Sequence, residues 1–173
     1  MGRLSENSVV NVKNKSHAVS GQIVVPASGA SGTIIAQGGR FDGWTVDLTS
    51  DVRPAYGYNL FGLELVKVAG EDPVAPGEHQ VRVEFDYDGG GVGKGGTATL
   101  YLDGDEVASG RVDNTVPGLF SADETTDVAG MIDGRYGVVA TRIVPAMYAL
   151  KRLVTRSDRP GRVGIEITPV TGP

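Results

Sequence analysis

The fold class is decided by the stretch Gln80-Val81-Arg82-Val83-Glu84-Phe85-Asp86-Tyr87-Asp88. Its odd-numbered residues are apolar or aromatic, and its even-numbered residues are polar or charged. Successive side chains of a β-strand point to opposite faces, so this alternation predicts a strand with one buried face and one solvent face.

The residues that follow this strand predict two more strands paired with it in antiparallel order. A glycine-rich run, 89–96, leads into the alternating segment 97–102. Asp103-Gly104 then supplies residues that tolerate positive φ, as a tight hairpin turn requires. The same glycine-rich run contains Gly91, Gly93 and Gly96 in the spacing of a dinucleotide-binding motif. That motif needs a helix after it, and a strand pattern follows instead, so we interpret the run as a hairpin loop.

Further strand patterns extend in both directions, and no helical period occurs before residue 135. The candidate strands are 8–13, 19–25, 33–37, 43–48, 54–59, 62–68, 79–87, 97–103, 106–112 and a final strand over 163–167. Strands that follow one another in this way predict an all-β fold, a two-sheet antiparallel β-sandwich, in a single domain over residues 1–173. Pro145 followed by an apolar and basic run predicts one short helix near 145–156, because proline suits the first helical position.

Composition and charge exclude several classes of function. The chain has 173 residues and no cysteine, which rules out disulfides, a thiolate nucleophile and cysteine-ligated zinc. Residues 1–130 carry 18 acidic against 9 basic side chains, whereas residues 131–173 carry 3 against 7. An acidic body argues against nucleic acid as a partner. No uncharged apolar run approaches the roughly 20 residues needed to cross a bilayer, so we expect a soluble chain with no membrane partner and leave its compartment open.

Few residues are candidates for chemistry. Asp123 and Asp127 share one face of an extended acidic segment, which is interpreted first as a solvated loop, then as a Ca²⁺ site, and last as a catalytic carboxylate pair. His17 and His79 have no metal-ligand or triad spacing and are expected to be ordinary strand or surface residues.

The aromatic residues allow two interpretations. On an exposed sheet face they would stack on sugar rings, with polar help from Asn59 and Arg40. Aromatic side chains on short strands are more often core, which is the interpretation we favour. The residues concerned are Trp44, Tyr56, Tyr58 and Phe61.

Five stretches between residues 6 and 129 together resemble the C-terminal region of large bacterial arylsulfatases, which follows the catalytic domain. They are Glu6 to His17, Ile34 to Trp44, Tyr58 to Glu64, Phe85 to Thr97 and Thr115 to Thr125. The resemblance implies a jelly-roll sandwich of the concanavalin A and laminin-G type. It also implies that the chemistry lies elsewhere, because the formylglycine motif Cys/Ser-x-Pro/Ala-x-Arg does not occur in this chain.

Residues 131–160 depart from the family's pattern, being basic and partly helical by pattern, and this puts closure of the sheet edge in doubt. The resemblance thus predicts a non-catalytic accessory domain that packs on a sulfatase catalytic domain, with no catalytic, cofactor-binding or metal-binding residue of the family carried over. The alternative is a stand-alone carbohydrate-binding module, with a glycan as its partner and with or without Ca²⁺ at Asp123 and Asp127.

Overall fold

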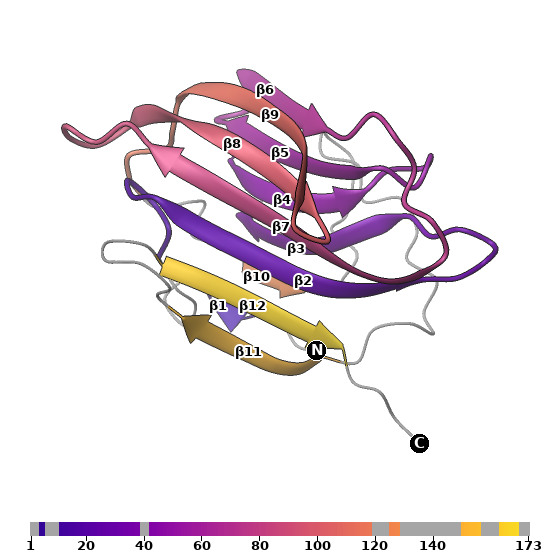
Figure 1. The fold of residues 1–173 in the computed structure, drawn as a ribbon. Coiled ribbons are helices and arrows are strands. Elements are labelled where there is room, and N and C mark those ends of the chain that lie inside the picture. Colours follow the sequence, from indigo (N-terminus) through magenta and orange to yellow (C-terminus); the bar gives the residue numbers. More distant parts are fainter. Residues whose placement is uncertain are drawn as a thin grey trace.

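The computed structural model describes the backbone of residues 4–5, 11–38, 42–118, 125–128, 150–156 and 163–169, with side chains for 11–38 and 42–118. Two sheets of six strands pack face to face (Figure 1). Sheet A has the order β1-β10-β3-β4-β5-β6 and sheet B the order β11-β12-β2-β7-β8-β9. The strand bounds in sheet A are β1 Leu4–Ser5, β10 Thr125–Val128, β3 Gly32–Gly38, β4 Gly43–Leu48, β5 Pro54–Leu60 and β6 Glu64–Ala69. Those in sheet B are β11 Leu150–Arg156, β12 Val163–Pro169, β2 His17–Val25, β7 Gly77–Tyr87, β8 Lys94–Leu102 and β9 Asp105–Asn114.

The predicted all-β sandwich is confirmed. Strands β7, β8 and β9 form the expected antiparallel series, and Asp103 and Gly104 take φ values of 53° and 96° in the turn between β8 and β9. Every neighbouring pair in the two sheets is antiparallel except β12 with β2, which is parallel. Of the candidate strand 8–13, the described residues 11–13 are not strand, so that prediction is wrong there. In the described parts of the chain, no helix is long and apolar enough to span a membrane.

The predicted helix near 145–156 is wrong over residues 150–156, which form β11. Leu150 to Arg156 pairs antiparallel with β12, Leu153 lying opposite Ile167. An isolated helix of this length is marginal in water. The edge of β12 offers a row of backbone partners, and Val154 and Thr155 are β-branched residues that favour extended backbone. Residues 145–149 lie outside the described part.

The final strand is confirmed as β12, and it is not a free edge, because β11 pairs with its outer side. The doubt about edge closure at this strand is thereby answered for the described residues. Sheet B ends instead at β11 on one side and at β9 on the other.

The core lies between the two sheets and comes from the alternation seen in the sequence. On β7 the side chains of Val81, Val83 and Phe85 are buried, whereas Arg82 and Glu84 are half-buried on the other face. Sheet A faces them with large side chains from its central strands. The members of this layer are Ile35, Trp44, Val46, Leu48, Tyr56 and Tyr58.

Candidate functional site

Three of the four aromatic residues considered for sugar stacking lie in the core, so a sugar platform built on these three is wrong. The core interpretation is wrong for the fourth, Phe61, which is 46% exposed in the turn between β5 and β6. Trp44, Tyr56 and Tyr58 are 2%, 1% and 5% exposed. The Trp44 Nε1–H donates to Gln37 Oε1 at 3.1 Å, and the Val116 N–H donates to the Tyr58 hydroxyl at 2.8 Å. Burial raises the pKa of Tyr58 to about 12. These three side chains belong to the core between the two sheets and are not available to a ligand.

Their proposed polar helpers are not available either. Asn59 is 3% exposed, and its Oδ1 accepts a hydrogen bond from the Gly62 N–H at 2.8 Å. This contact shapes the turn between β5 and β6. Arg40 lies outside the described residues.

The two histidines lie on different strands, β2 and β7, as the sequence predicted for ordinary strand residues. His17 is buried, with its ring centroid 5.3 Å from that of Phe85 and 6.0 Å from that of Trp44. His79 Nδ1 lies 2.7 Å from Asp103 Oδ2, and its Nε2 lies 2.8 Å from the Ala75 carbonyl oxygen. Within the described ranges no three His, Asp or Glu side chains gather as metal ligands would.

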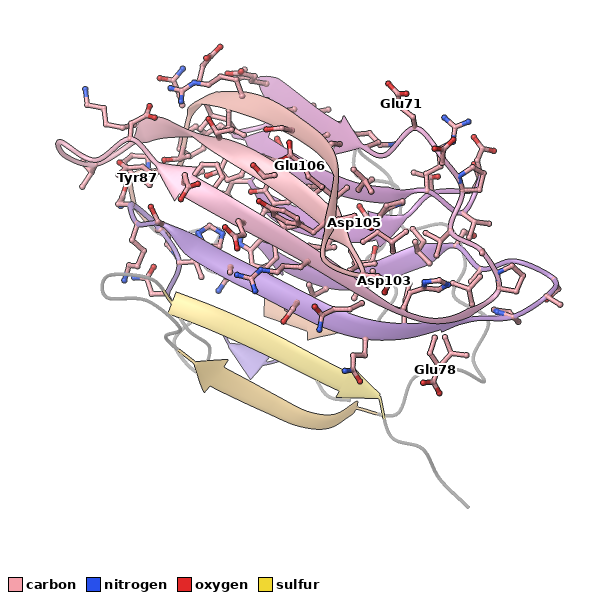
Figure 2. All side chains as sticks on the ribbon, viewed as in Figure 1. Glu71, Glu78, Tyr87, Asp103, Asp105 and Glu106 are labelled. Carbon is pink, nitrogen blue, oxygen red and sulfur yellow. The ribbon has the colours of Figure 1, made fainter. Side chains whose placement is uncertain are left out.

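Asp103 ties the hairpin of β8 and β9 to the start of β7. Its Oδ1 accepts the Gln80 N–H at 2.7 Å, and its N–H donates to the Gln80 carbonyl at 2.9 Å. Partial burial alone would raise the pKa of Asp103, but the hydrogen bonds from the Gln80 N–H and the His79 ring outweigh burial and leave this pKa below its ordinary value. Figure 2 shows Asp103 and Tyr87 at opposite ends of sheet B, so this contact is remote from the glycine-rich loop.

Asp103→Ala is therefore expected to destabilise the chain by about 1 kcal/mol at neutral pH, since a half-exposed carboxylate keeps only part of its hydrogen-bond contribution. A carboxylate whose folded pKa is lowered contributes above its unfolded pKa and loses that contribution as pH falls through the folded value. In urea unfolding, the difference in unfolding free energy between the wild type and the variant should thus be constant at pH 5–7 and shrink below pH 3.8, the ordinary pKa of an aspartate. A gap of equal size at pH 2.5 would contradict the ionic contribution.

Asp47 is a second carboxyl group whose pKa is shifted, and its role is structural. The hydroxyls of Thr33 and Thr45 donate to its two oxygens at 2.8 and 2.6 Å. Burial raises the pKa of Asp47, and the two hydroxyls oppose that effect. By register Asp127 lies opposite Ala36, in the cross-strand row of Thr45 and not in that of Asp47, and its side chain and Asp123 lie outside the described part. The Ca²⁺ interpretation of that pair stays a prediction.

The solvent face of sheet B is polar. Arg82 lies between Ser20 and Tyr101 in one cross-strand row, and its guanidinium pairs with Glu84 along the strand. Tyr101 is partly exposed there. This face offers a half-buried ion pair beside one accessible aromatic ring, which can hydrogen-bond to and stack on a polar ligand.

A different surface gathers the exposed apolar side chains. Phe61, Leu63 and Leu65 are 46%, 89% and 55% exposed, and we call these three residues the apolar edge. They belong to the β5–β6 turn and to β6, the last strand of sheet A. Contiguous exposed apolar side chains mark interaction sites more often than chance, whereas single ones do not.

The turn holds Phe61 outward at an energetic cost. The Leu63 N–H donates to the Leu60 carbonyl at 2.9 Å, and Phe61 and Gly62 take φ values of 52° and 68°. A left-handed conformation costs a bulky residue about 1–2 kcal/mol, whereas glycine adopts it freely. A strained aromatic residue that is half exposed is not explained by core packing.

The glycine-rich loop lies at the same end of the sandwich. The Thr115 N–H donates to the Gly93 carbonyl at 3.4 Å, and its neighbour Val116 donates to Tyr58 near the end of β5. The base of the loop is fixed by Asn14, whose Oδ1 accepts the Gly93 N–H at 2.8 Å. Val92, 67% exposed, thus adds an apolar side chain to this end. The run is a hairpin loop between β7 and β8, as predicted.

Leu63 and Leu65 do not stand out as candidate site residues in the sequence. In residues 63–68 both faces of the strand pattern are mixed, with two leucines and Lys67 on one side and Glu64 and two valines on the other. Only the packing of Val68 against Gly110 of β9 shows which side is buried. No sequence signal could have decided this.

Comparison with known proteins gives the fold and no family. No protein-family model and no curated protein matches the chain. Among solved structures, domains LG4-5 of the mouse laminin α1 chain match with 19% identity and a TM-score of 0.52 over 83% of this chain. The chain has the laminin-G type of jelly-roll fold.

This chain spans 35% of the length of that laminin chain, so the likeness concerns one sandwich. A heptameric SAP-like pentraxin from Limulus polyphemus matches with 11% identity and a TM-score of 0.37, over 67% of this chain and 60% of that one. The laminin-G fold agrees with the jelly-roll type that the resemblance implied. It leaves the sulfatase association as a prediction.

Proposed function

We propose that this chain is a non-catalytic accessory module that docks on a partner protein through the apolar edge. The observation that carries the proposal is the placement of the exposed apolar side chains. Among the residues whose side chains are described, four of the five large exposed apolar ones, Phe61, Leu63, Leu65 and Val92, belong to one end of the sandwich, and the fifth, Val24, is on the solvent face of sheet B. Burying such side chains contributes about 25 cal/mol per Å² of apolar area, which favours a protein surface as the occupant.

The partner we propose is the catalytic domain of an arylsulfatase. The support for it is the resemblance carried by the five stretches between residues 6 and 129, two of which, Tyr58 to Glu64 and Phe85 to Thr97, include Phe61 and Val92. In this arrangement the module stabilises the catalytic domain or shapes access to its substrate. The chain itself supplies no nucleophile of the sulfatase type.

The test adds the purified chain to an arylsulfatase catalytic domain that lacks its own C-terminal region. We expect binding and a longer half-life of sulfatase activity on heating, and no turnover of an aryl sulfate by the chain alone. The double variant Leu63→Lys and Leu65→Lys should lose this effect, because charged side chains replace apolar contact area. The matched control Val24→Lys should keep it. Equal loss in both variants, or turnover by the isolated chain, would contradict the proposal.

A second candidate is carbohydrate binding at the solvent face of sheet B, favoured by Tyr101 beside the Arg82–Glu84 pair. In a glycan screen, binding that is lost in Tyr101→Ala and kept in the Leu63→Lys and Leu65→Lys variant would support this site over the apolar edge.

A further inference from the structure

We propose that the partner adds a β-strand to the free side of β6, and that this strand carries an acidic side chain opposite Lys67 and an apolar one opposite Leu65. The inference rests on the proposed function and specifies how the docking occurs. It is carried by the backbone register of β6, by the side chains on its outer face and by the charge of Lys67.

The register shows which backbone groups of β6 are free. Strands β6 and β5 pair in a regular antiparallel register without a bulge, in which Leu65 lies opposite Asn59 and Lys67 opposite Gly57. The Gly70 N–H donates to the Pro54 carbonyl at 2.9 Å in the same register. Hydrogen-bonded pairs alternate in an antiparallel ladder, so Val66 and Val68 bond to β5.

The N–H and C=O groups of the odd-numbered residues therefore point away from β5. Among the described strands β6 pairs only with β5, so the backbone of Leu65, Lys67 and Ala69 forms a free edge. Such an edge is a template for another strand.

Strand β9, which ends sheet B, is better protected against strand addition than β6, which ends sheet A. Strand β9 carries charged side chains near both of its ends and has a register shift against β8, both of which discourage strand addition. Its Arg111 is already engaged, with its guanidinium nitrogens 2.8 and 2.5 Å from the two oxygens of Asp88. On β6 the outer face presents Leu65 and Lys67, with Leu63 just before the strand.

Lys67 decides which strand fits. In an antiparallel pair, opposing residues share a face, so an odd-numbered β6 residue would face an odd-numbered residue of a second copy. Within β6 and the residue before it, Lys67 would then lie opposite Leu63, Leu65, Ala69 or another Lys67, and never opposite Glu64, which is on the inner face. A second copy would place an apolar side chain or another lysine opposite Lys67, whose charge already attracts Asp47 of β4. A foreign strand with an acidic residue would add a directly opposed ion pair.

The test uses the ¹⁵N-labelled chain and a capped nine-residue peptide with threonine at alternate positions. The peptide carries a glutamate to lie opposite Lys67 and, two residues later, a leucine to lie opposite Leu65. Without peptide, the Leu65, Lys67 and Ala69 amides should exchange quickly with deuterium, while those of Val66 and Val68 are protected. Saturating peptide should protect the three odd-numbered amides. Lys67→Glu should weaken the peptide about twofold to fivefold, as exposed ion pairs do, and a peptide with lysine in place of glutamate should restore the affinity.

The outcomes separate the two proposals. If the sulfatase catalytic domain binds but neither it nor the peptide protects the odd-numbered amides, docking stands and strand addition is wrong. If neither binds, both proposals fail. If the odd-numbered amides are protected in the concentrated chain alone and lose protection on dilution, pairing with a second copy replaces this inference.

Discussion

Trp44→Ala is expected to lower the free energy of unfolding by about 3–5 kcal/mol, the range for removing a large aromatic side chain from a packed core. Trp44 is 2% exposed, and its Nε1–H satisfies the Oε1 of buried Gln37. The variant leaves a cavity between the sheets and removes the partner of that amide oxygen, which adds to the cost. A loss of this size is a large fraction of the stability of an ordinary domain.

The measurement is urea unfolding followed by far-UV circular dichroism, because Trp44 is the single tryptophan and the variant has no tryptophan fluorescence. Tyr101→Ala, on the solvent face of sheet B, is the matched control and should cost much less. If Trp44→Ala unfolded at the same urea concentration as the wild type, the assignment of this residue to the core would be wrong. Sugar stacking by an exposed Trp44 would then have to be considered again.

Gly96→Ala is expected to destabilise the chain by about 1–3 kcal/mol or more, through overpacking and not through loss of backbone freedom. A Cβ at this position would lie 2.4 Å from Phe85 Cζ and 2.6 Å from the Asp86 carbonyl oxygen. The oxygen belongs to the backbone of β7 and cannot move without breaking the β7–β8 ladder. Phe85 is itself fixed in the core.

Gly118→Ala is the control for this prediction, since no atom of the described residues lies within 4 Å of the Cβ that it would add and no positive φ is involved. It should change stability by less than about 1 kcal/mol, in either direction. Thermal unfolding of both variants against the wild type is sufficient. Similar melting temperatures for Gly96→Ala and the wild type would contradict the close packing of β7 on β8.

The sequence predicted the sandwich because its strongest patterns are also its best-formed strands. Residues 80–88 alternate without a break, and the structure buries Val81, Val83 and Phe85 while leaving Arg82 and Glu84 on the other face. Segment 43–48 was predicted with the bounds that β4 has. In such strands the local pattern and the tertiary packing agree, so pattern alone suffices.

The sequence failed where tertiary pairing overrides local preference. Proline followed by alanine, leucine and lysine indicates a helix, yet residues 150–156 pair with β12, a partner that no local pattern reveals. The apolar edge was missed for a related reason, because Leu63, Leu65 and Lys67 form no recognisable pattern until the packing of β6 is known. The core interpretation is confirmed for Trp44, Tyr56 and Tyr58, whose strands are central in sheet A, and is wrong for Phe61, which lies in the turn after β5.

The most direct test of the docking account is the map of ¹H–¹⁵N chemical shift changes in the labelled chain when the unlabelled arylsulfatase catalytic domain is added. The account predicts that the changes gather on residues 61–69 and on the glycine-rich loop at Val92. Changes centred on Arg82, Thr99 and Tyr101 of sheet B, or none at a saturating concentration of the catalytic domain, would contradict it.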